Sequence, residues 1–162
     1  MTITNPIHES ITVKPEVTTL VNQIIKNGYY KKESNTERFT MLKSLAENIC
    51  RIYNVSPVKI ITQNVPLGAY ACYVPSANTI KLGNTSIVSF LHELRHHLQF
   101  TGDKQKRGLN KEQDAHAWSL RVFSIAVPKM FEKDVKEDKI AALAWDDDNQ
   151  KVVNRIGYSQ II

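Results

Sequence analysis

The hexapeptide HELRHH at residues 92–97 groups three histidines with a glutamate. On an α-helix His92 and His96 lie about 40° apart around the axis, so both imidazoles project from one face. Such a pair can bind one metal ion at roughly 2.0–2.1 Å, the usual zinc–nitrogen distance. Glu93 lies about 100° from His92, close enough to reach a water on that metal. A carboxylate there can accept a proton as water attacks a carbonyl carbon and pass it to the leaving amine.

A site of this kind needs a third protein ligand, and the sequence offers Glu112, Asp114 and His116. On a helix Glu112 and His116 share a face, whereas Asp114 and His116 point about 200° apart. The three side chains therefore cannot all bind one ion. The helical pattern alone does not choose among them, because apolar residues occur on more than one side of this segment.

Two amphipathic helices are predicted before this motif. Apolar residues recur at helical spacing over residues 15–27, with a proline at the start and Gly28 just past the end. A second apolar stripe follows and is expected to end near Asn54. This second helix is expected to begin with Ser34 and Glu37, which have the spacing of a capping box.

Short β-rich runs at residues 58–62, 68–74 and 79–82 predict a small twisted sheet, the last two runs forming a hairpin. Helical spacing returns over residues 86–100, where a stripe of isoleucine and leucine lies opposite the two motif histidines. Gly102 is expected to end the helix.

The next helix is expected to start after Asn110, which can cap it, and to end at Val127, because Pro128 cannot continue its hydrogen-bond ladder. A shorter helix is predicted over residues 135–145, before an acidic run. The resulting fold class is α+β: N-terminal helices, a small sheet with a hairpin, the motif helix and a C-terminal helix that carries a ligand.

The composition indicates one globular domain over residues 1–162, with 42% hydrophobic and 23% charged residues. No stretch approaches the roughly 18 apolar residues of a membrane span, and the start of the chain does not resemble a signal peptide. We therefore expect a soluble cytoplasmic protein. Cys50 and Cys72 are expected to be reduced and buried.

The net charge of +5 suggests a mild affinity for anionic partners. A local excess of positive charge lies in residues 101–111, which a nucleic acid could contact. Without an aromatic pattern for base stacking, the segment is better interpreted as a solvated connection between two helices.

The runs GAYACYVPSANTIKLGNTSIVSFLHELRHHLQF and EQDAHAWSLRVF resemble the zincin metallopeptidases, particularly the ImmA/IrrE-like and minigluzincin types. The resemblance covers residues 58–127. It implies a zincin-like fold, in which the strand at residues 79–82 is the sheet edge that binds an extended peptide substrate.

By this resemblance His92 and His96 are zinc ligands, Glu93 is the general base and Asp114 is the third ligand. The implied function is zinc-dependent hydrolysis of peptide bonds in a peptide or protein substrate. One alternative is a zincin-fold protein that binds zinc or a protein partner without catalysis. Another is a SprT-like protease that acts near DNA, which the chain would resemble if His116 were the third ligand.

Overall fold

The computed structural model describes residues 11–62, 71–104, 108 and 110–137. Within these residues the strands of a small mixed sheet are preceded and followed by helices along the chain. The predicted α+β class is therefore confirmed. The elements are α2 (Pro15–Lys26), η1 (Tyr29–Lys31), α3 (Asn35–Ile52), β1 (Lys59–Ile61), β2 (Ala71–Val74), η2 (Pro75–Ala77), β3 (Thr79–Leu82), α4 (Ile87–Thr101), α5 (Lys111–Ala126) and α6 (Pro128–Lys136).

The two N-terminal helices form as their apolar stripes predict. Pro15 occupies the first turn of α2, where its missing N–H costs nothing, and Gly28 follows the helix at φ 87°. The start of α3 differs in detail from the expectation, because Ser34 is the N-cap but its side chain makes no capping hydrogen bond. The helix ends close to the predicted place, and Asn54 adopts a left-handed conformation there.

The three described strands pair in the order β1-β3-β2. β2 pairs antiparallel with β3, which confirms the predicted hairpin, while β1 pairs parallel with β3. The expectation that residues 79–82 form the sheet edge is therefore wrong, since β3 is the central strand. The reason is a contact between distant parts of the chain: β1 pairs with the side of β3 that the hairpin partner β2 leaves open. The described edge next to α4 belongs to β2.

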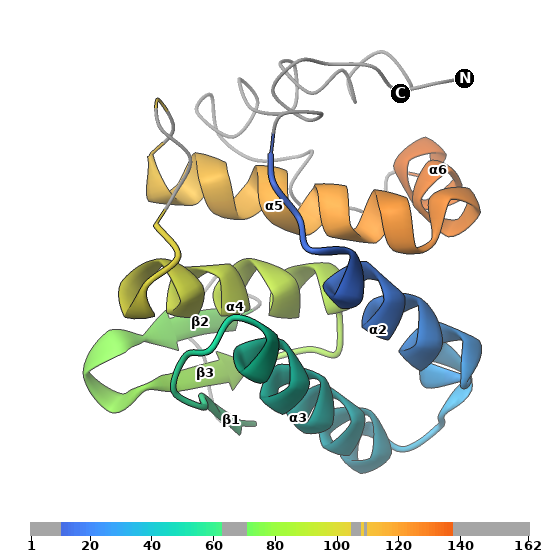
Figure 1. The fold of residues 1–162 in the computed structure, drawn as a ribbon. Coiled ribbons are helices and arrows are strands. Elements are labelled where there is room, and N and C mark those ends of the chain that lie inside the picture. Colours follow the sequence, from blue (N-terminus) through green and yellow to red (C-terminus); the bar gives the residue numbers. More distant parts are fainter. Residues whose placement is uncertain (1–10, 63–70, 105–107, 109, 138–162) are drawn as a thin grey trace.

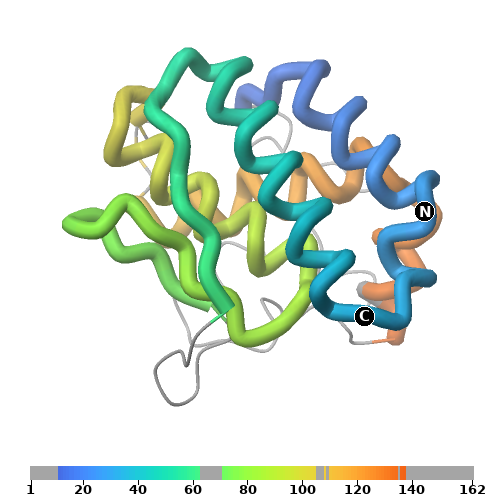
Figure 2. The backbone as a smooth tube through the Cα atoms, turned by 90° about the horizontal axis from the view of Figure 1, so that it is seen from below, coloured from blue at the N-terminus to red at the C-terminus, as the bar shows by residue number. Residues whose placement is uncertain are grey.

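Helix α4 lies between the sheet and α5, with the sheet below it and α5 above it in Figure 1. The helices α2 and α3 pack against each other, and the view from below shows them on one side of the molecule and the β2–β3 hairpin on the other (Figure 2). Side chains from all these layers meet in one core. Its largest fully buried members include Trp118, Tyr29, Phe90, Phe123, Phe131, Leu42, Ile49 and Ile80.

The C-terminal part of the described chain differs from the predicted helix at residues 135–145. Helix α6 begins at Pro128 and runs to Lys136, because proline is well accommodated in the first turn of a helix. The rest of that predicted helix and the tail lie outside the described residues.

No helix within the described segments has both the length and the apolar character needed to cross a membrane.

Both cysteines are free thiols. Cys50 is buried as expected, whereas Cys72 on β2 is only partly buried.

Candidate metal site

The motif histidines are positioned by the local chemistry of α4. The side chain of Ser86 accepts a hydrogen bond from the backbone N–H of Ser89 and caps the first turn. Gly102 ends the helix, as expected. The apolar stripe is completely buried, so the opposite side of the helix, with His92 and His96, faces α5. The residues of this stripe are Ile87, Leu91, Leu94 and Leu98.

The other half of the site comes from the first two turns of α5. The side chain of Asn110 accepts from the backbone N–H of Gln113 at 2.8 Å, and the Gln113 side chain accepts from the backbone N–H of Asn110 at 3.2 Å. This reciprocal capping box holds the turn that carries Glu112. α5 runs back over α4, as Figure 1 shows, and the Glu112 carboxylate reaches both motif histidines.

Three of the potential ligands meet within hydrogen-bond distance. The Nε2 atoms of His92 and His96 are 3.1 Å apart. One carboxylate oxygen of Glu112 lies 3.1 Å from His92 Nε2, and its other oxygen lies 2.7 Å from His96 Nε2. Donor atoms that share a tetrahedral zinc at about 2.0–2.1 Å are roughly 3.3 Å apart, so these separations suit a common ion.

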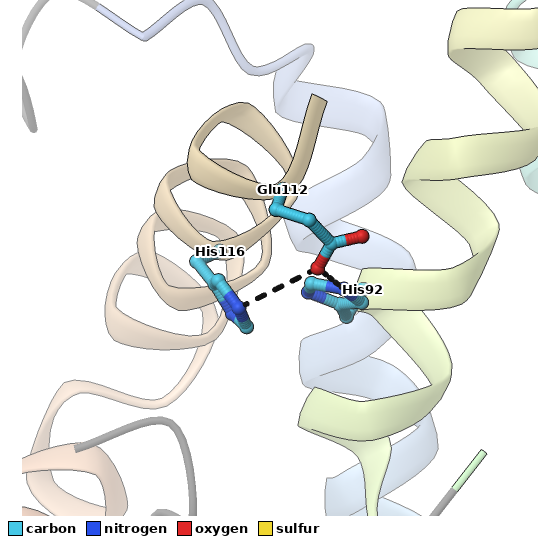
Figure 3. A group of neighbouring side chains, drawn as sticks. All are labelled: His92, Glu112 and His116. Atoms are coloured by element: carbon cyan, nitrogen blue, oxygen red, sulfur yellow. Dashed lines mark hydrogen bonds and ion pairs between the residues drawn. The ribbon is translucent and has the colours of Figure 1, made fainter. Parts of the chain in front are cut away.

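His116 lies one helical turn beyond Glu112 and points toward the same place (Figure 3). Its Nε2 is 3.9 Å from the Glu112 carboxylate, and its ring centroid is 4.1 Å from that of His92. The ligand atoms of His92, Glu112 and His116 all lie within 4.8 Å of one another. The described residues thus include a group of side chains with the donors that zinc prefers.

Burial and charge differ across this group. His92 and His116 are buried, while 61% of the Glu112 side chain is exposed, so the carboxylate lies at the outer side of the site. Hydrogen bonds from His92 and His96 hold the pKa of Glu112 well below its usual range. Burial by itself would lower the pKa of His96, but hydrogen bonds to Glu112 and Gln99 outweigh it and raise that pKa. Metal binding at these atoms would release the protons that the imidazole Nε2 atoms donate to Glu112.

Glu93 lies beside the group but projects toward the sheet. Its carboxylate is 3.9 Å from His92 Nε2, and its side chain is 13% exposed. Burial raises the pKa of Glu93, although the nearby histidines and a hydrogen bond with the backbone of Tyr73 act against that rise. A mostly buried carboxyl group with a raised pKa, next to candidate metal ligands, suits proton transfer.

Asp114, the expected third ligand, is placed differently. It is completely buried, and its Oδ2 accepts from Arg95 Nε at 2.7 Å and from Gln99 Nε2 at 2.7 Å. The carboxylate directed at the Nε2 atoms of both motif histidines is that of Glu112. The difference arises because Asp114 leaves α5 in another direction, toward the buried guanidinium of Arg95.

Gln99 belongs to none of the motifs in the sequence, but its amide contacts both Asp114 and His96. One signal was present in the sequence: Gln99 and His96 are three residues apart, which places them on neighbouring positions of one helix face.

His97 is directed away from the candidate metal site, where it contacts the Tyr73 hydroxyl at 3.0 Å and the Ser56 carbonyl at 2.7 Å. The basic segment at residues 101–111 lies partly outside the described residues.

The chain matches no family model, and neither a curated protein nor a solved structure matches it.

Proposed function

We propose that the chain is a zinc-dependent peptidase of the zincin type, in which His92, His96 and Glu112 bind the metal and Glu93 is the general base. One observation carries this proposal: the Glu112 carboxylate lies 3.1 Å and 2.7 Å from the Nε2 atoms of the two motif histidines. A carboxylate and two imidazoles are a common ligand set of catalytic zinc.

The position of Glu93 favours catalysis over metal storage. Zinc, when bound, supplies Lewis acidity that polarises a carbonyl group and lowers the pKa of water. Glu93 accepts the proton of the attacking water and delivers it to the departing amide nitrogen. Its burial assists this transfer, since a raised pKa makes the carboxyl group a better proton acceptor and keeps it able to release the proton afterwards.

The proposed substrate is a peptide or a protein, and the proposed location is the cytoplasm. The free thiols of Cys50 and Cys72 support a reducing compartment.

The test combines metal content with hydrolysis, using the chain without a histidine tag. We expect about one zinc per chain by plasma mass spectrometry. Glu93→Gln should keep that zinc and reduce cleavage of a fluorogenic peptide mixture by roughly 10²–10⁴-fold. Glu112→Ala should lose both zinc and activity.

Glu47→Gln is the matched control, because Glu47 is exposed on α3 and belongs to no part of the site. It should retain both the zinc and the hydrolysis of the unmodified chain. Zinc-free protein after incubation with zinc, or full activity in Glu93→Gln, would contradict the proposal.

A closed, non-catalytic zinc site is the second candidate, and the position of His116 favours it. With His116 as a fourth ligand beside His92, His96 and Glu112, the ion would have no open position for water. X-ray absorption of the zinc protein separates the two functions: four protein ligands without water support the closed site, and a bound water supports the peptidase.

The SprT-like alternative predicts that His116 replaces the carboxylate as third ligand. In that case His116→Ala would abolish zinc binding while Glu112→Ala retained it. The peptidase proposal with Glu112 as ligand predicts the opposite order of effects.

A further inference from the structure

Gln99 lies between the candidate metal site and the buried pair of Arg95 and Asp114. Its side-chain nitrogen donates to Asp114 Oδ2 at 2.7 Å and to the backbone carbonyl of Lys111 at 3.0 Å. Both amide hydrogens are thus directed at oxygens that can only accept. The two acceptors determine the orientation of the carboxamide, so its oxygen must face His96 Nδ1, which lies 2.9 Å away.

This orientation determines which nitrogen of His96 carries the proton. A carboxamide oxygen can only accept, so His96 Nδ1 must donate its hydrogen to Gln99. The lone pair of a neutral His96 is then on Nε2, the atom that faces His92 and Glu112. Gln99 therefore prepares the imidazole for metal binding through Nε2.

Asp114 holds Gln99 in this position. The Asp114 carboxylate is itself anchored by Arg95, through Nε at 2.7 Å and Nη2 at 3.4 Å. Arg95 is held in turn by Asp103 and by the ring of Trp118, whose centroid is 5.5 Å from the guanidinium carbon. Because the side chains of Arg95 and Asp114 are 5% and 0% exposed, the carboxylate has little freedom to turn toward the histidines.

We propose that Gln99 is a positioning residue that holds His96 in the Nδ1–H tautomer for metal binding, and that Asp114 acts through Gln99 instead of binding the metal. This inference rests on the metal site of the proposed function. It assigns a role to the residue that the resemblance to the zincins had suggested as the third ligand.

The first test is a variant that keeps the shape of Gln99 but removes its polar atoms. Gln99→Met should weaken zinc binding by roughly 10–100-fold in a chelator competition and change the visible spectrum of the Co²⁺ form. Tyr29→Phe is the control, since it removes a hydrogen bond of 2.6 Å to the Thr85 carbonyl, and neither residue is part of the candidate metal site. The control should bind both metals like the unmodified chain.

Asp114→Asn separates positioning from ligation. Asparagine keeps an oxygen that can accept from Gln99, so zinc affinity should fall less than in Gln99→Met. A larger fall in Asp114→Asn than in Gln99→Met would overturn the inference and identify Asp114 as a ligand.

A measurement on the unmodified chain keeps the inference testable if a variant does not fold. Long-range ¹H–¹⁵N correlation spectra of the zinc-loaded protein should show His96 bound through Nε2, with its proton on Nδ1. A proton on Nε2 would overturn the inference.

The two proposals fail in different ways. Equal zinc affinity in Gln99→Met and the unmodified chain would overturn the role of Gln99 and leave the peptidase proposal intact. Failure of the unmodified chain to bind zinc or Co²⁺ would overturn the metal site, and the role of Gln99 with it.

Discussion

Removal of the Asp114 carboxylate should destabilise the metal-free protein far more than removal of the Glu112 carboxylate. Asp114→Ala leaves the guanidinium of Arg95 without its buried partner, and the side chains of this pair are 0% and 5% exposed. Breaking such a pair costs about 3–5 kcal/mol. Arg95 retains Asp103, whose side chain is 48% exposed, so we expect the lower end, about 3 kcal/mol.

Glu112→Ala should have a small effect in the absence of metal. The Glu112 side chain is 61% exposed, and exposed ion pairs contribute about 0–1 kcal/mol to the free energy of unfolding. Excess zinc should remove most of this difference between the two variants. At a free concentration 100-fold above its Kd, zinc should stabilise the unmodified chain by about 2.7 kcal/mol, and Glu112→Ala should lose that gain.

Urea unfolding followed by far-ultraviolet circular dichroism measures both effects, first with a chelator and then with excess zinc. A cost below about 1 kcal/mol for Asp114→Ala together with a cost of about 3 kcal/mol for Glu112→Ala in the chelated protein would contradict this expectation. That result would mean that the Glu112 carboxylate, and not that of Asp114, stabilises the packing of α4 against α5.

Three further changes test other parts of the structure. Asn110→Ala removes the capping box of α5 and should cost about 1 kcal/mol in the same urea assay, whereas an unchanged midpoint would show that the cap is dispensable. Leu91→Ala opens the core beneath the motif and should cost about 2–5 kcal/mol. Burial raises the pKa of Tyr29 above its ordinary 10.0, so folding should lose stability as the pH rises through about 10, where only the unfolded state ionises. Unfolding between about pH 9 and about pH 11 should therefore depend less on pH in Tyr29→Phe, and an unchanged slope would exclude Tyr29 as a cause.

The helices were largely predictable because their signals are local. The apolar stripe of α4, its end at Gly102 and the cap at Asn110 all act within a few residues of the chain. The capping box proposed for Ser34 was wrong, although the helix starts there. Residue spacing permits such a hydrogen bond without requiring it, because side-chain rotamers decide whether it forms.

The sheet order could not be predicted from the same kind of signal. Each strand is short, and the residues of the runs at 58–62 and 79–82 do not show which strand each run pairs with. β3 becomes central only because β1 pairs beside it in parallel, across an intervening segment and the hairpin. Whether a strand is an edge or a centre therefore depends on contacts between distant parts of the chain.

The arrangement of His92 and His96 on one helix face, with Glu93 to one side, could be predicted from the sequence because it follows from the geometry of a single α-helix. Which carboxylate lies beside the two histidines depends on how α4 and α5 pack together. α5 is buried on most of its circumference, so its pattern does not show which face meets the histidines. Arg95 on the neighbouring helix attracts Asp114, and Glu112 is left to face the imidazoles. That choice depends on the packing of two helices against each other, which no spacing within either helix specifies.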